Sequence, residues 1–221
     1  MQNRFLAFFV LGILAVIVFI FFFFRTQPVM RPKPAASNPS RSEQTAPSVT
    51  FVNPARGTKT PRVTLVEFGD FACGPCKQAQ SILEQVLARY PDEVQLVWKD
   101  LPNDSTHPEA TRAAVAAHCA DRQGKFWEYG NALFDRQTFL SDTQYAQIAT
   151  DLGLNLSKFS ACFTNQETLG IVSKDREEGI ALGVVATPAV FVGTELLVGL
   201  PSIDELSRLI DQQRLTHEPT P

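Results

Sequence analysis

The sequence predicts an α/β domain organised around a parallel strand–helix–strand unit, preceded by one apolar segment long enough to cross a membrane. Two buried-strand patterns, Arg62–Phe68 and Val94–Lys99, flank a helical pattern, and a parallel pair of strands needs such a crossover. A long alanine-rich helical block follows, and a strand hairpin with one more helix completes the domain. With 221 residues and 44% hydrophobic content, the chain can bury a real core, which excludes a disordered protein.

The apolar segment Phe5–Phe24 is a run of 20 residues without a charge or a proline. A helix of that length spans roughly 30 Å, enough to cross the hydrocarbon core of a bilayer. A cleaved signal peptide is the alternative, but the run exceeds the ~7–15 residues of a signal-peptide core, and no small-residue cleavage site directly follows Phe24. We therefore expect residues 1–25 to be an uncleaved transmembrane anchor.

The orientation of this anchor is not given by its flanking charges alone. Arg4 and the amino terminus face Arg25, Arg31 and Lys33 across the run, a difference of one charge that favours a cytoplasmic carboxyl side. The arrangement of the four cysteines favours the opposite side, where disulfides persist. We expect a single-pass protein of a bacterial cell membrane with its domain on the extracytoplasmic side.

Residues 26–55 form a proline-rich linker in which Ser, Asn, Gln and Thr separate the prolines and few apolar residues are available for burial. This composition predicts a semi-extended tether of at most about 3.1 Å per residue. Val49–Val52 is expected to add a short edge strand at the start of the domain. The prolines are Pro28, Pro32, Pro34, Pro39, Pro47 and Pro54.

The strand–helix–strand unit opens the domain, which we place at residues 56–215. Arg62–Phe68 is apolar and β-branched, as in a buried strand, and Val94–Lys99 alternates as a second strand. Between them a helix is expected from about Cys73 to just before Pro91. Its inner face carries apolar residues at the spacing of a helix packed on a sheet, namely Ala79, Ile82, Leu83, Val86, Leu87 and Tyr90.

A helical insertion is expected at about residues 104–182. Thr106–Glu109 has the pattern of a capping box that opens an alanine-rich helix ending at Asp121. Ser141 and Asp142 are expected to cap a later helix. The remaining helical patterns lie at Lys125–Phe134, Leu156–Phe163 and Glu167–Leu182.

The end of the domain returns to strands. Ala189–Val192 and Leu196–Val198 predict a hairpin around Gly193-Thr194. Pro201-Ser202 then opens an amphipathic helix, and residues 216–221 form a tail. The apolar positions of this helix are Ile203, Leu206, Leu209 and Ile210.

The main chemical motif is Cys73-Gly74-Pro75-Cys76, at the junction of the first strand and the first helix. Unsatisfied N–H groups at a helix start, together with the helix dipole, stabilise a thiolate. We therefore expect Cys73 to ionise more easily than a free thiol and to act as an exposed nucleophile. Cys76, one turn later, can resolve a mixed disulfide formed at Cys73.

The cysteine motif and Pro188 also have other interpretations. A zinc site needs two further ligands, and the candidates His118 and Cys119 are adjacent in a helix, so they point in different directions. We expect no metal. A structural disulfide within so short a ring removes little chain entropy. Pro188, after Thr187, can simply be an ordinary trans proline that starts a strand.

Three segments together resemble the DsbA-like thioredoxin-fold oxidoreductases over about Thr60 to Leu215. They are Glu67-Phe68-Gly69-Asp70-Phe71-Ala72-Cys73-Gly74-Pro75-Cys76, Gln123-Gly124-Lys125-Phe126-Trp127-Glu128-Tyr129 and Gly183-Val184-Val185-Ala186-Thr187-Pro188-Ala189-Val190-Phe191-Val192. The resemblance implies a thioredoxin fold interrupted by a helical insertion, which agrees with the element order above.

The resemblance also implies roles for residues outside the cysteine motif. Pro188 would be cis and face the active-site disulfide, and Thr187 would offer backbone hydrogen bonds to a substrate chain. Glu67 would be the acidic residue beneath the active site. The alternative is a solvent-exposed carboxylate at the end of the strand. Cys119 and Cys162, 43 positions apart, would form a structural disulfide, the alternative being two buried thiols.

One departure from the family concerns the residues between the cysteines. Strong oxidants of the family usually carry Pro-His there, whereas Gly74-Pro75 is the thioredoxin pair and suggests a less oxidising potential. The direction of electron flow therefore stays open.

The sequence thus predicts an enzyme that exchanges disulfides with cysteine-containing client proteins and uses no cofactor beyond the Cys73–Cys76 disulfide. Glu67 would assist proton movement, and a membrane redox partner is expected. A reductase or isomerase fed by a membrane electron donor is one alternative, and a non-catalytic anchored binding module is another. The 22 acidic and 15 basic residues between positions 56 and 221 argue against a nucleic-acid partner.

Overall fold

The computed structural model describes residues 13, 14, 16–23 and 44–216. The chain divides into two units, residues 1–42 and 43–221, and the fold below is that of the second unit. Most of the expected anchor and of the linker at 26–55 lies outside the described residues. Residues 13, 14 and 16–23 are helical, and no helix within the described part of the chain has both the length and the hydropathy needed to span a membrane.

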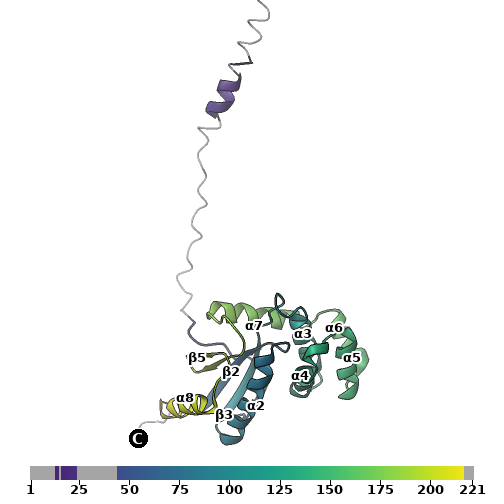
Figure 1. Cartoon of the computed structure of the whole chain (residues 1–221), viewed down its shortest axis with the longest axis vertical. Coiled ribbons are helices and arrows are strands. Elements are labelled where there is room, and N and C mark those ends of the chain that lie inside the picture. Colours follow the sequence, from purple (N-terminus) through teal and green to yellow (C-terminus); the bar gives the residue numbers. More distant parts are fainter. Residues whose placement is uncertain (1–12, 15, 24–43, 217–221) are drawn as a thin grey trace, which may run out of the picture. The chain divides into compact units, whose positions relative to one another are not determined.

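A five-stranded mixed sheet forms the centre of the domain (Figure 1). Its strands are β1 (Ala55–Gly57), β2 (Val63–Gly69), β3 (Val94–Asp100), β4 (Ala189–Val192) and β5 (Glu195–Val198), in the order β1-β3-β2-β4-β5. Strands β2 and β3 are parallel, and all other pairs are antiparallel. The predicted strand–helix–strand unit and the hairpin are confirmed.

Helices cover both faces of the sheet. α2 (Gly74–Arg89) and α8 (Ile203–Thr216) pack on one face, over a core that includes Leu65, Leu83 and Leu206. α7 (Leu169–Ala181) lies on the other face, where Phe68 and Phe191 are buried. A helical insertion separates β3 from β4 and gathers beside the sheet (Figure 1). Besides α7 it comprises α3 (Ala110–Asp121), α4 (Phe126–Asp135), the 3-10 helix η1 (Gln137–Phe139), α5 (Asp142–Asp151) and α6 (Leu156–Thr164).

The expected edge strand at Val49–Val52 is wrong, because β1 begins at Ala55. Residues 50–53 instead form a turn, in which the backbone N–H of Asn53 donates to the carbonyl of Thr50 at 3.1 Å. The side chain of Phe51 is fully exposed. The N–H of Thr50 also donates to Oδ1 of Asn53 at 3.0 Å, so both backbone groups of Thr50 are engaged within the turn and not with a neighbouring strand.

The expected capping box at Thr106–Glu109 is also wrong. Helix α3 begins at Ala110, and the residue before it, Glu109, makes no side-chain cap. Asp104 caps the helix instead, because its carboxylate accepts a hydrogen bond from the backbone N–H of Thr111 at 2.9 Å. The predicted cap at Ser141 is confirmed, because its hydroxyl accepts the N–H of Gln144.

Candidate active site

The cysteine motif lies at the junction between the end of β2 and the start of α2. A turn after Gly69 brings Cys73 to the N-cap of the helix, with its N–H donated to the carbonyl of Asp70 at 3.0 Å. Gly74 and Pro75 form the first turn, a position that proline favours. Cys76 is one turn further in, and both thiols are free. The helix start therefore presents its unsatisfied N–H groups next to Cys73.

The two thiols differ strongly in acidity. A hydrogen bond from the Cys76 thiol, aided by Thr187, lowers the pKa of Cys73 to about 6, although partial burial opposes this shift. Burial raises the pKa of Cys76 far above its usual range. Near neutral pH, Cys73 is thus the thiolate and Cys76 the protonated partner.

Cys73 is less accessible than we expected from the sequence. It is only 5% exposed, and its Sγ lies 3.5 Å from the carbonyl oxygen of Thr187. The Thr187–Pro188 peptide bond is cis. The loop before β4 therefore covers the nucleophile, which explains the difference from the expected exposed thiol.

Glu67 lies on β2 within the same site and is fully buried, which excludes the alternative of a solvated carboxylate. The side-chain amide of Gln80 donates to both of its carboxylate oxygens at 2.9 Å. Burial raises the pKa of Glu67 to about 7, while Gln80 and Arg56 oppose the shift. The guanidinium of Arg56 in turn donates to the side-chain amide oxygen of Gln80 at 3.0 Å. Glu67 can therefore change protonation state near neutral pH.

Sequence reasoning missed Gln80 and Arg56. Gln80 follows Cys76 by four positions and so shares its helix face, a signal that could have singled it out. Arg56 carried no such signal, because it reaches the site from β1, a strand that the sequence analysis placed too early in the chain.

The helical insertion also contacts residues 70–76, the segment from the end of β2 through the cysteine motif, which we call the redox loop. The side-chain amide of Gln137 donates to the carbonyls of Phe71 and Cys73, each at 2.8 Å. The Phe71 ring stacks on Trp98 with centroids 4.6 Å apart. A Cβ at Gly130 of α4 would lie only 2.8 Å from the Phe71 ring, so a larger residue there would displace the ring or the helix. Gln137 was not identified from the sequence.

A family model described as thioredoxin matches residues 51–212. The chain belongs to the thioredoxin family. The match covers the sheet, the cysteine motif and the helical insertion.

Several solved structures share the fold of this thioredoxin-family chain. A thioredoxin-like oxidoreductase from Silicibacter pomeroyi is 25% identical, with a TM-score of 0.67 over 75% of this chain and 94% of the other. A periplasmic thioredoxin-like protein from Salmonella enterica serovar Typhimurium is 25% identical, with a TM-score of 0.61 over 74% and 91%. The thiol-disulfide exchange protein alpha-DsbA2 from Wolbachia pipientis, 22% identical, shares the fold with a TM-score of 0.66 over 73% and 87%. The predicted resemblance to DsbA-like oxidoreductases is confirmed.

Curated relatives share only part of their length with the chain. The Na⁺/H⁺ antiporter NhaA 1 of Mycolicibacterium vanbaalenii is 34% identical over 139 residues, which is 62% of this chain and 22% of the antiporter. The chain thus spans about a fifth of this relative. Most of the antiporter lies outside the match.

The other two cysteines lie apart from the redox loop. Cys119 of α3 and Cys162 of α6 are joined by a disulfide, with Cα atoms 5.8 Å apart. Both are buried. Nε2 of His118, the other zinc candidate, lies 2.6 Å from a carboxylate oxygen of Asp100. The two candidate zinc ligands are therefore engaged with different partners.

Removing this disulfide should lower stability without affecting thiol exchange. Replacing Cys119 and Cys162 together by alanine should lower the free energy of unfolding by about 4 kcal/mol, because the bond closes a loop between residues 43 positions apart. Urea unfolding of the variant and the parent measures the difference, and alkylation of Cys73 serves as the control. Equal midpoints, or free thiols at both positions in the non-reduced parent, would contradict the expectation.

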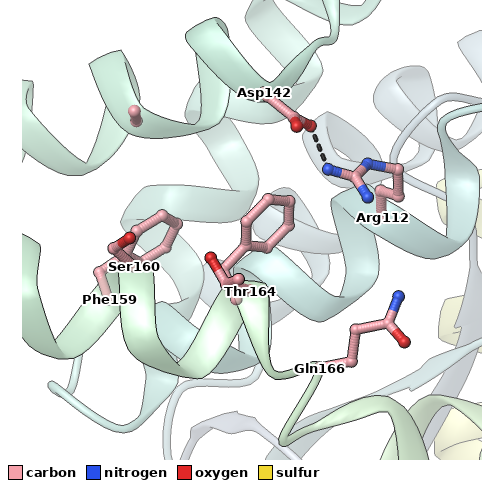
Figure 2. A pocket seen from close by; sticks show the side chains of 8 residues that line it. Arg112, Asp142, Phe159, Ser160, Thr164 and Gln166 are labelled. Carbon is pink, nitrogen blue, oxygen red and sulfur yellow. Dashed lines mark hydrogen bonds and ion pairs between the residues drawn. The ribbon is translucent and has the colours of Figure 1, made fainter.

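A pocket of about 390 Å³ opens in the insertion (Figure 2). Arg112 of α3 donates to Asp142 of α5 at its edge, and the Arg112 guanidinium lies 4.9 Å from the ring centroid of Phe163. Its lining includes no residue of the redox loop or of the loop that carries Pro188. The pocket is therefore separate from the candidate active site.

Proposed function

We propose that the protein is a membrane-anchored thiol–disulfide oxidoreductase that acts on cysteines of extracytoplasmic client proteins through Cys73 and Cys76. The observation that carries the proposal is the difference in acidity between the two thiols. The thiol with the lowered pKa lies at the helix start under the loop of Pro188, and the one with the raised pKa lies behind it. A scaffold that only presents a binding surface needs no such difference in acidity between two thiols.

The reaction transfers two electrons between the client and the cysteine pair, and the reduced pair carries one proton, on Cys76. In the oxidising direction, a client thiolate attacks Sγ of Cys73, the Cys73–Cys76 bond breaks, and Cys76 leaves and takes a proton. A second client thiolate then attacks the client sulfur of the mixed disulfide and releases Cys73 as a thiolate. Glu67 serves Cys76 as proton donor or acceptor, because its raised pKa suits that task. Thr187 and Pro188 dock the client chain, and no further cofactor takes part.

Disulfide formation is the direction that we favour. A stabilised Cys73 thiolate favours the reduced enzyme, so its disulfide is a better oxidant. The Gly74-Pro75 dipeptide supports the alternative, a reductase or isomerase that receives electrons from a membrane donor. In both cases a membrane redox partner returns the cysteine pair to its working state.

We place the domain on the extracytoplasmic side of a bacterial cell membrane, with residues 1–25 as the anchor and 26–55 as the linker. The Cys119–Cys162 disulfide supports this side, because disulfides persist in oxidising compartments. The description of the Salmonella structure as periplasmic supports it as well. The membrane anchor is proposed from the sequence of Phe5–Phe24.

Equilibration of the full-length, detergent-solubilised protein with glutathione buffers tests this proposal. We expect complete exchange of the Cys73–Cys76 pair, with a potential closer to about −120 mV than to about −270 mV. A value near the lower figure would favour the reductase alternative. A pair that does not exchange with glutathione at all would contradict the function.

A further inference from the structure

A buried carboxylate, Asp70, pairs with a partly exposed histidine, His107, beside the redox loop, and neither has a part in the exchange steps above. Asp70 directly follows β2, three residues before Cys73, and its side chain is fully buried. One carboxylate oxygen accepts the N–H of Ala72 at 2.8 Å. The other accepts the N–H of Asn103 at 3.3 Å and lies 2.8 Å from Nδ1 of His107. Asp70 therefore joins the redox loop to the loop that opens the insertion.

The direction of the histidine hydrogen bond follows from the chemistry of the carboxylate. An ionised carboxylate can only accept, so Nδ1 of His107 must carry the proton and donate it to Asp70. The His107 side chain is 32% exposed. His107 is the one side chain among the three donors, because the others are backbone N–H groups fixed by the fold.

The Asp70 charge acts directly on the nucleophile. Oδ1 of Asp70 accepts a hydrogen bond from the backbone N–H of Ala72, the residue before Cys73. The backbone carbonyl of Asp70 accepts one from the N–H of Cys73 itself. A buried negative charge so close to a forming thiolate disfavours it, and Asp70 indeed works to raise the pKa of Cys73. Donation from His107 draws charge away from Cys73 and reduces this effect.

We propose that His107 is a positioning residue of the exchange reaction, which acts through Asp70 to stabilise the Cys73 thiolate and thereby makes the disulfide a stronger oxidant. This inference rests on the proposed function. In the glutathione equilibrium, the enzyme disulfide gains two electrons from two glutathione thiolates, Cys76 takes a proton, and Cys73 stays a thiolate. A less stable thiolate therefore shifts the equilibrium towards the enzyme disulfide.

The two partners should shift this equilibrium in opposite directions. His107→Ala should lower the ratio of reduced to disulfide enzyme about fivefold at fixed glutathione, as expected for a partly screened interaction between nearby charges. Asp70→Asn removes the charge but retains the shape, and it should raise the ratio by a similar factor. The pH at which Cys73 is half alkylated should rise in the first variant and fall in the second.

A double-mutant cycle separates this role from a merely structural one. In the Asp70→Asn background, His107→Ala should no longer change the glutathione ratio. Arg122→Ala, which breaks an exposed pair with Glu167 in the same insertion, is the matched control and should leave the ratio unchanged.

Two outcomes would overturn the inference. One is a His107→Ala effect of equal size in both backgrounds, and the other is a shift of both single variants in the same direction. Failure of the proposed function looks different, since the wild-type pair would then not exchange with glutathione at all.

Discussion

Cys76→Ser protein should accumulate mixed disulfides with client proteins, whereas Cys73→Ser protein should form none and lose turnover. With a pKa of about 6, Cys73 is mostly thiolate at pH 7 and attacks a client disulfide without help. The raised pKa of Cys76 keeps it protonated and unreactive until a mixed disulfide forms beside it. Incubation of each variant with a disulfide-bonded client, followed by non-reducing electrophoresis and mass mapping, measures the adducts.

The pH dependence of alkylation provides the control for this assignment. Iodoacetamide should react with Cys73 in the Cys76→Ala protein at a rate that declines as the pH falls, because protons remove the thiolate. Since the hydrogen bond from Cys76 is lost in this variant, the midpoint should lie above the value of about 6 in the parent. Adducts with Cys73→Ser but not with Cys76→Ser would reverse the roles of the two cysteines.

Glu67→Gln should stabilise the domain at neutral and alkaline pH, by up to about 3 kcal/mol for a pKa shift from 4.5 to about 7. Below pH 4.5 the carboxyl is protonated in both folded and unfolded chains, so the variant and the parent should be equally stable. Between pH 4.5 and about 7 only the unfolded chain releases the proton, and the parent loses stability. Urea unfolding at pH 4, 6 and 8 should show the difference growing and then levelling.

The same substitution should slow the resolving step and spare the first attack. Cys76 must exchange a proton out of contact with bulk water, and glutamine cannot carry it. The Cys73 thiolate is stabilised mainly by the hydrogen bond from Cys76 and by the helix start, so its attack should be nearly unchanged. Stopped-flow kinetics separate the steps, with Glu195→Gln, which changes an exposed acid of β5, as the control. Equal slowing of both steps, or of neither, argues against a proton relay.

The parts of the fold that the sequence predicts are those with a strong local pattern. A mostly apolar, β-branched run defines Arg62–Phe68, and the helical spacing that begins at Ala79 defines α2. β1 was misplaced because Ala55–Gly57 has no apolar alternation, and its strand character comes only from pairing with β3. The start of α3 was misplaced because its cap, Asp104, lies seven residues before the N–H that it accepts.

The candidate site divides in the same way. The cysteine motif carries its own signal, and Glu67 and Pro188 were named only through a family resemblance. Gln137 and His107 reach the redox loop from segments 64 and 37 positions away from their partners, and no local pattern marks such contacts. Long-range hydrogen bonds of this kind become visible only when the chain is folded.

The two hydrogen bonds from Gln137 make the redox loop depend on the insertion, so protein engineering and evolution should change the two segments together. A minimal domain produced by deleting the insertion would leave the carbonyl of Phe71 without its side-chain donor and the carbonyl of Cys73 with only the N–H of Lys77. It would also remove Phe134 from the ring of Phe71. A buried acceptor left unpaired costs about 1–3 kcal/mol. Chimeras between relatives should therefore exchange the cysteine motif and the η1 segment together, and changes at one should be inherited with compensating changes at the other.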